Sequence, residues 1–397
     1  MAVYNQESSS FQIKNVPPCL AKEEVKMKSL LRLLLKTHYQ KNHFHQAQKE
    51  QGMTLIELLI GTVMAFLILT PMLAFVVDML NTDRREQVKA NTEQDIQAAV
   101  DFIAQDLSEA IYIYDNRALN GQPGRNEQQV RPQLPNAADP NQTPILVFWK
   151  RQQLRNSLPI NPTVAATVKP DDCAAQTTPQ CNDTYVRSLV AYYQVRDNSP
   201  TWCQPSGGTC PSRIIRYEIR DGIDRLPDPS TGAAATPYGI AQTTTAQQTD
   251  PAFNTSTNPT QSFNLNNPTR NVTNTAGFAD QRSGAQNPQV LVNYLDHSTT
   301  QNIPVPTGAE CQTLLGFVPP AVTPAGTPAF APGDLLITDG QSHSFYACVD
   351  TSKNIARVTI RGNSLRRIQT NADYNPNNPA YFPTATVQVQ GLGARGK

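Results

Sequence analysis

The residues best suited to covalent chemistry in this chain of 397 residues are its seven cysteines. One of them, Cys19, lies close to the N-terminus. The other six form an even set: Cys173, Cys181, Cys203, Cys210, Cys311 and Cys348. The set contains no Cys-x-x-Cys pair, and a zinc site would need tighter spacing or histidines nearby. We expect no metal site and no cofactor. The set predicts three disulfides, which form in an oxidising space outside the cytoplasm.

The spacing of the cysteines favours pairing between sequence neighbours. That pairing gives Cys173–Cys181, Cys203–Cys210 and Cys311–Cys348, and other connectivities remain open. Free buried thiols are the alternative.

Histidine is too sparse here to indicate catalysis. After residue 52 only His297 and His343 remain, without a nucleophile motif, a His-Glu-x-x-His pair or a phosphate-binding glycine loop. Gly333-Asp334 and Asp339-Gly340 predict turns rather than calcium ligands. We therefore expect a protein that is not an enzyme, with an anchored hydrolase using either histidine as the alternative.

One carboxylate stands at the start of a long apolar run. The twenty residues from Leu58 to Val77 carry no charge, and as a helix they extend about 30 Å, enough to cross a bilayer core. Glu57 lies just inside the start of this run. A carboxylate in hydrocarbon is costly and normally has a partner there.

The residues around Glu57 carry a resemblance to a known family. A polar, basic leader ends at Gly52, and a hydrophobic helix follows with Glu57 as its fifth residue, in the order Gly52-Met53-Thr54-Leu55-Ile56-Glu57-Leu58-Leu59. This pattern resembles the class III signal of type IV pilins and pseudopilins. The family usually begins its mature chain with Phe, where this chain has Met53.

The resemblance implies a sequence of processing and assembly steps. Residues 1–52 are a leader that prepilin peptidase removes after Gly52, with N-methylation of Met53. Glu57 then neutralises the new N-terminal amine of a neighbouring subunit and sets the axial register of a fibre. Pro71 lies where the family helix opens locally during assembly. The implied partners are prepilin peptidase, other minor pilins or pseudopilins, an inner-membrane assembly platform and membrane lipid.

The apolar run continues into an amphipathic pattern. Apolar residues recur at steps of three and four, which places them on one face of a helix: Val88, Ile96, Val100, Ile103, Leu107 and Ile111. Asp95, Asp106 and Glu109 fall on the other faces. We predict one helix whose transmembrane half covers 53–80 and whose amphipathic half covers 81–115.

The rest of the chain, 116–397, predicts one β-rich extracytoplasmic domain. Candidate strands are rich in β-branched or aromatic residues: Ile145–Lys150, Tyr185–Arg196, Arg213–Arg220, Val290–Leu295, Leu335–Thr338, Ser344–Val349 and Ile355–Arg361. Residues 228–288 form a low-complexity polar loop, and 116–143 and 371–385 are similar. The expected fold class is α+β, with the long N-terminal helix packed on an antiparallel sheet, as in pilins.

The charge distribution excludes one class of partner. Residues 1–52 carry eight Lys/Arg and four Asp/Glu, a net charge of +4, which leaves −3 for the remainder of a chain whose net charge is +1. A slightly acidic mature part without a basic run indicates no nucleic-acid partner. The resemblance and the cysteines place the leader in the cytoplasm, the helix once through the inner membrane, and the domain in the periplasm or on the surface.

Two further segments refine the resemblance. Arg213–Ile219 followed by Val290–Leu295 looks like the sheet of the larger minor pseudopilins of the J or W type. Val358–Arg367 is similar to the C-terminal strand and turn of the hormogonium polysaccharide secretion pseudopilins of cyanobacteria. The implied function is a minor subunit that primes or caps a type IV pilus-like or type II secretion-like fibre, supporting polysaccharide secretion and gliding motility. The alternative is a single-pass anchor displaying a carbohydrate- or surface-binding module that never enters a fibre.

Overall fold

The computed structural model describes residues 54–121, 129–136, 138–159, 181–220, 288–299, 302–319 and 330–393. It divides into two units within one helix, the first ending at Val76 and the second running from Val77 to Lys397. The leader 1–52 and residues 228–287 of the predicted loop lie outside the described residues, as do Cys19 and Cys173.

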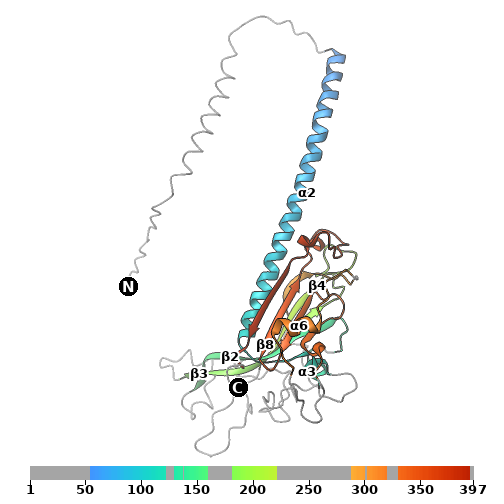
Figure 1. Ribbon diagram of the computed structural model, residues 1–397. Coiled ribbons are helices and arrows are strands. Elements are labelled where there is room, and N and C mark those ends of the chain that lie inside the picture. Colours follow the sequence, from blue (N-terminus) through green and yellow to red (C-terminus); the bar gives the residue numbers. More distant parts are fainter. Residues whose placement is uncertain are drawn as a thin grey trace, which may run out of the picture. The chain divides into compact units, whose positions relative to one another are not determined.

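The helix α2 (Leu55–Ser108) has 54 residues and is the longest element (Figure 1). It begins where Thr54 accepts hydrogen bonds from the backbone of Glu57 and Leu58. It ends at Ser108, so the prediction that the helix reaches 115 is wrong. Residues beyond Ser108 turn into strand β1 (Ala110–Ile113), because Ala110 and Ile113 are fully buried by pairing with the next strand.

The first sheet contains five antiparallel strands in the order β1-β2-β3-β4-β5. After β1 these are β2 (Gln142–Pro159), β3 (Cys181–Val195), β4 (Ser212–Arg220) and β5 (Gln289–Leu295). In β2 the five successive residues Ile145–Trp149 are all fully buried. Both faces of this part of the sheet are therefore covered, which explains its continuous apolar sequence.

The second sheet contains four antiparallel strands in the order β6-β7-β8-β9. They are β6 (Leu336–Thr338), β7 (Phe345–Asp350), β8 (Ile355–Arg361) and β9 (Thr384–Gln390). The sequence predicted a loop as far as 385 and no strand over 384–390. β9 alternates half-buried Ala and Val with exposed Thr and Gln, a period of two that suits an edge strand with one covered face.

Short helices connect these strands. They are α3 (Asn116–Asn120), α6 (Gly308–Leu315) and the 3₁₀ turns η1 (Arg131–Gln133), η5 (Pro332–Leu335), η6 (Leu365–Arg367) and η7 (Pro379–Tyr381). α6 starts with a capping box, in which the Thr307 side chain accepts from the Glu310 backbone and the Glu310 carboxylate accepts from the Thr307 backbone. Such reciprocal capping fixes the first turn of a helix.

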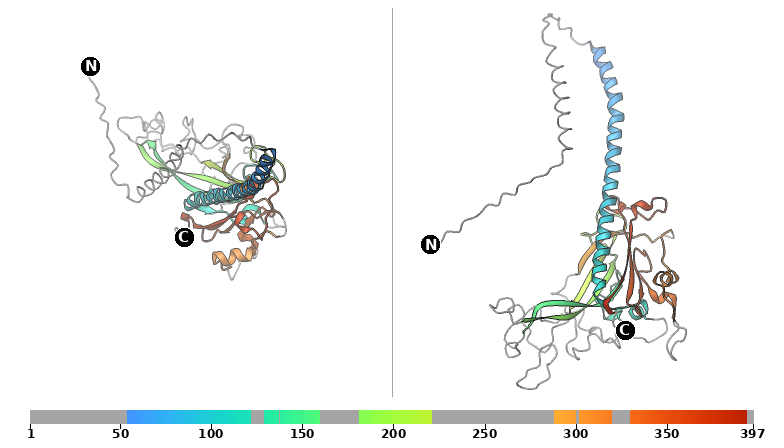
Figure 2. Two further views of the ribbon diagram at one scale, coloured as in Figure 1. Left: turned by 90° about the horizontal axis from the view of Figure 1, so that it is seen from above. Right: turned by 60° about the vertical axis from the view of Figure 1, so that its left-hand side comes forward.

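The two sheets join at both ends and enclose one core with α2. At one end Leu295 forms a β-bridge with Gly362. At the other, the Asn354 side chain accepts from the Ile113 N–H and donates to the Ala110 carbonyl. Both sheets contribute to a core that includes Ile96, Val100, Ile103 and Leu107 of α2, and Figure 2 shows this part of α2 beside strands of both sheets.

The α+β class is confirmed in its coarse form: a long apolar helix and antiparallel sheets. The expectation of a single sheet is wrong, because the strands after Leu335 form a sheet of their own. Pairing between distant segments decides the number of sheets, and no local pattern carries that information.

Candidate functional site: the long helix and its attachment

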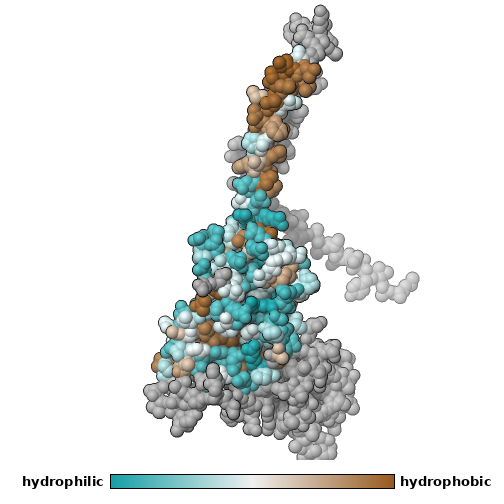
Figure 3. All heavy atoms as spheres, turned by 90° about the vertical axis from the view of Figure 1, so that its right-hand side faces the viewer, coloured by the Kyte–Doolittle hydropathy of each residue, from teal (hydrophilic) through white to brown (hydrophobic). Residues whose placement is uncertain are grey.

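The N-terminal half of α2 is apolar around its whole circumference. The large hydrophobic side chains from Leu55 to Leu80 are 49–87% exposed, and they form the mostly brown surface along the helix in Figure 3. A helix that is hydrophobic on all sides needs an apolar surrounding. Among the described residues, α2 is the one helix long and apolar enough to cross a membrane, as a single-pass anchor requires.

The threonine hydroxyls within this segment form hydrogen bonds to carbonyls of their own helix. The hydroxyls of Thr62 and Thr70 donate to the carbonyls of Leu59 and Phe66, each at 2.8 Å. A hydroxyl bonded to its own helix does not present an unpaired donor to lipid, where it would cost several kcal/mol.

Glu57 differs from these threonines because nothing in the described chain neutralises it. Its side chain is exposed, and no cation of the described residues lies within ion-pair distance. Its backbone N–H donates to the Thr54 carbonyl at 3.0 Å, which fixes the first helical turn. The carboxylate therefore lies beside an apolar surface, with no cation from the part of the chain that the structure describes to pair with it.

The remaining N-terminal predictions divide into two groups. Gly52 and Met53 lie outside the described residues, so the cleavage and methylation sites stay predictions. Pro71 lies within α2, which remains helical through it. Because proline has no N–H, the Leu67 carbonyl loses its usual helical donor at this depth.

The C-terminal half of α2 is fastened by a buried ionic cluster that the sequence analysis placed wrongly. Asp106 was expected on a face away from the apolar stripe, but it is 7% exposed and faces the first sheet. It accepts from Lys150 Nζ at 2.9 Å and from Arg216 Nε at 2.7 Å. Tyr192 Oη donates to it at 2.6 Å. Each of these three partners comes from a different strand, so one carboxylate ties α2 to β2, β3 and β4.

The electrostatics of this cluster favour the ionised carboxylate. Burial alone would raise the pKa of Asp106, but the hydrogen bond and charge of Arg216, with the charge of Lys150, hold it below its ordinary value. Glu218 balances the second positive charge of the cluster: its carboxylate lies 2.6 Å from Arg216 Nη2 and 3.4 Å from Lys150 Nζ. Arg216 and Glu218 stand two positions apart in a predicted strand, so their side chains share one face of the sheet. This spacing was the one sequence feature that could have indicated a charged cluster.

The segment that follows β8 fastens a second point of α2. A Cβ at Gly362 would lie 2.3 Å from Ile96 Cδ1 and 2.8 Å from Thr92 Cγ2, so a larger residue would force these side chains of α2 to shift. Arg367 forms an ion pair with Asp95 and stacks on the Tyr294 ring at 4.5 Å. The Val358–Arg367 segment therefore attaches α2 to β8 of the second sheet and to β5 at the edge of the first.

Arg366 contacts a different part of the domain from Arg367. Its side chain is fully buried, and its guanidinium donates to the carbonyls of Pro205, Gly207 and Thr209 at 2.9–3.1 Å. These carbonyls belong to the loop closed by a disulfide between Cys203 and Cys210. Adjacent arginines in sequence predict an exposed basic site, so the burial of Arg366 was missed.

Two of the three predicted disulfides are present. Cys203–Cys210 closes the loop around Arg366, and Cys311–Cys348 links α6 to β7. Cys173 and the side chain of Cys181 lie outside the described residues. These bonds agree with the expectation of an oxidising environment.

Neither histidine forms a catalytic arrangement within the described residues. His297 is 4% exposed, and its Nε2 lies 3.4 Å from Asp373. Burial lowers its pKa, against the charges of Asp296 and Asp373. His343 Nδ1 lies 2.8 Å from Thr338 Oγ1 within the turn that precedes β7. No serine or cysteine of the described chain bonds either ring, and no three metal-ligand side chains gather there.

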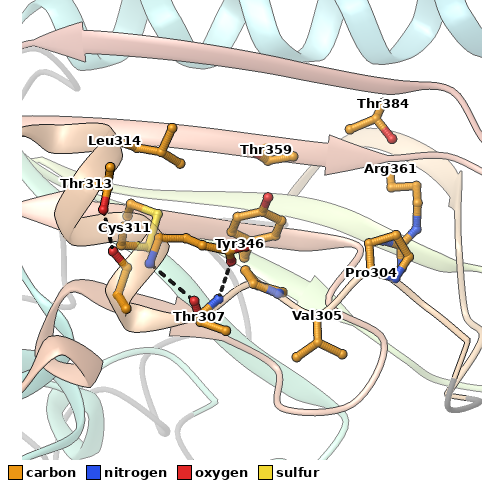
Figure 4. A pocket seen from close by; sticks show the side chains of 14 residues that line it. Pro304, Val305, Thr307, Cys311, Thr313, Leu314, Tyr346, Thr359, Arg361 and Thr384 are labelled. Atoms are coloured by element: carbon orange, nitrogen blue, oxygen red, sulfur yellow. Dashed lines mark hydrogen bonds between the residues drawn. A yellow bond between two sulfur atoms is a disulfide. The ribbon is translucent and has the colours of Figure 1, made fainter.

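A groove of 590 Å³ lies over the outer face of the second sheet. Its walls come from residues 304–307 and from α6, and its floor from Tyr346, Thr359 and Thr384 (Figure 4). The Cys311–Cys348 disulfide lines it and holds α6 against β7. The sequence analysis did not anticipate this groove, because its lining is drawn from four separated segments.

Comparison of the chain with known protein families, with curated proteins and with solved structures finds no match.

Proposed function

We propose that the chain is a minor pilin-like subunit, a pseudopilin, of a type IV pilus-like or type II secretion-like assembly. Prepilin peptidase would cleave it between Gly52 and Met53. The observation that carries the proposal is α2 itself. Its first half is exposed and apolar, with one acid that has no cation partner among the described residues, and its second half belongs to the core of the sheet domain.

Glu57 supplies the chemistry of assembly. Cleavage after Gly52 creates a positively charged amine on Met53, five positions before the uncharged run begins at Leu58. A lone charge so close to hydrocarbon is costly. A carboxylate from a neighbouring subunit offsets that cost. Since Glu57 has no internal cation in the described chain, it is available for this pairing. The pairing also selects one axial offset between subunits.

The attachment of α2 to the sheets suits a fibre subunit. Asp106 binds three strands, Asp95 binds Arg367, and Gly362 packs on Ile96. These contacts fix the part of α2 that follows Val77 to both sheets, as a subunit that assembles through this helix requires. A simple tether has no need of such a connection.

The specific role and system belong to the same proposal. The two segments that look like the sheet of J- or W-type pseudopilins lie in neighbouring strands, β4 and β5. The segment similar to the hormogonium polysaccharide secretion pseudopilins, Val358–Arg367, joins both sheets to α2. These features support a minor subunit that primes or caps the fibre and assists polysaccharide secretion and gliding motility. The domain would then lie in the periplasm or on the surface.

Replacing Glu57 with Gln tests the assembly step. The change keeps the size of the side chain and removes its charge. We expect Glu57→Gln to insert in the membrane normally but to be lost from sheared fibre fractions and from crosslinks to partner pilins. Glu86→Gln is the matched control, because Glu86 is an exposed acid of the same helix outside the apolar segment.

If Glu57→Gln enters fibres as efficiently as the parent chain, the fibre role is wrong. The single-pass anchor with a binding module would then be favoured, a function for which the groove over the second sheet is the supporting observation.

A further inference from the structure

The groove over the second sheet has the size and stability of a binding site. Its 590 Å³ lies within the roughly 300–1,000 Å³ typical of small-molecule sites. One wall, α6, is fixed by its capping box and by the Cys311–Cys348 disulfide. The groove is therefore preformed, which lowers the entropic cost of binding.

The walls of the groove present apolar surface to solvent. Val305 is 53% exposed and Leu314 is 47% exposed. Among the large hydrophobic residues of the described sheet domain, exposure of this degree is uncommon. The Tyr346 ring lies on the floor between these walls (Figure 4).

Two hydrogen-bonding groups at the groove have no partner in the described chain. Tyr346 Oη forms no hydrogen bond there. Arg361 donates through Nε to Asp296 at 3.0 Å and through Nη2 to the Ser342 carbonyl at 2.7 Å, and its guanidinium lies over the Tyr374 ring at 5.3 Å. Its Nη1 has no hydrogen-bond acceptor among the described residues. The Thr384 hydroxyl lies on the same floor and is exposed.

The lining offers no spare positive charge, and its one carboxylate already accepts from the Thr307 N–H at 2.8 Å. Arg361 is neutralised by buried Asp296, and Glu310 is the one carboxylate on the wall. An anion would find no spare positive charge, and an aliphatic ligand would bury Tyr346 Oη and Arg361 Nη1 unpaired. A peptide strand would find the backbone groups of β8 already used by β7 and β9. The remaining class is a neutral molecule with an apolar face and many hydroxyls.

We propose that this groove binds a neutral saccharide, with one sugar face against Val305, Leu314 and the Tyr346 ring. The sugar hydroxyls bond to Tyr346 Oη, Arg361 Nη1 and Thr384. The proposal stands on the groove alone and does not depend on fibre assembly.

Binding is measured on the full chain in detergent micelles, first on an array of neutral glucose, galactose, mannose and N-acetylglucosamine oligosaccharides and then by calorimetry with the best binder. Tetragalacturonate and a proline-rich peptide serve as charged and peptide probes. Leu314→Trp fills the groove, and Leu392→Trp is its matched control, because Leu392 is also 47% exposed and does not line the groove. Tyr346→Phe removes one hydroxyl.

We expect a neutral oligosaccharide to bind, Leu314→Trp to weaken it at least tenfold, Tyr346→Phe to weaken it severalfold, and Leu392→Trp to leave it unchanged. Absence of binding by every neutral saccharide, undiminished binding to Leu314→Trp, or preference for tetragalacturonate or the peptide would overturn the proposal. Fibre incorporation of Leu314→Trp is scored separately, so failure of this site is distinguishable from failure of the assembly role.

Discussion

Replacing Asp106 with Asn should destabilise the sheet domain strongly, because it leaves two buried cations without their main counter-charge. Lys150 and Arg216 have side chains 8% and 9% exposed. Breaking a buried pair by removing one partner costs about 3–5 kcal/mol. Glu218 still contacts both cations, at 3.4 and 2.6 Å, so we place the loss at the lower end, about 3 kcal/mol.

The loss is measured by urea unfolding of the full chain in a mild detergent. Fluorescence of Trp149 reports the transition, because this residue is fully buried and its indole N–H donates to Tyr114 Oη at 2.9 Å. Asp101→Asn is the control: Asp101 is an exposed acid of the same helix, and among the described residues its side chain bonds only to Gln97. We expect that variant to lose less than about 0.5 kcal/mol.

The pH dependence gives a second readout of the same carboxylate. The pKa of folded Asp106 lies below its ordinary value of 3.8. Its contribution to the free energy of unfolding is therefore complete above that value and is lost as pH falls through the folded pKa. Asp106→Asn should lack this part of the acid dependence. If Asp106→Asn is as stable as Asp101→Asn, the cluster does not fasten α2 to the sheets.

Three further outcomes are expected. Burial keeps His297 neutral by lowering its pKa below the ordinary 6.5, so stability should fall as pH drops below that value, and His297→Gln should flatten the fall in urea midpoints between pH 7 and 5; an unchanged slope contradicts this. Gly362→Ala should destabilise by about 1–3 kcal/mol, because its Cβ overlaps Ile96, and adding Ile96→Val should recover part of the loss in the same titration. The Cys311→Ala/Cys348→Ala pair should increase protease cleavage within α6 while leaving the first sheet intact; equal cleavage rates refute the linking role.

The long helix was predictable because its cause is local. The uncharged run and the apolar stripe recur at helical spacing, and α2 is continuous through both. The end of the helix was not predictable from the sequence. Ile111 continues the helical period of apolar residues, but the residues beside Ile111 are buried by pairing with β2. Strand pairing also decides β9, which the sequence did not predict. The Thr and Gln residues of β9 resemble those of the surrounding loops.

The charged attachments of α2 were beyond sequence reasoning for a physical reason. A carboxylate on a helix is placed on the solvent face unless its partners are known, and those of Asp106 stand 44 to 110 positions away. Arg366 likewise looks like an exposed cation until the Cys203–Cys210 loop folds around it. Glu57 needs no such knowledge of partners, because the apolar composition around it alone sets the cost of its charge, and its role in assembly stays a prediction.

The most direct test of the account is the intact mass and N-terminal residue of the protein isolated from membranes in which prepilin peptidase is active. The account predicts a chain that begins at N-methylated Met53 and lacks residues 1–52. A membrane-bound chain that retains those residues would contradict it.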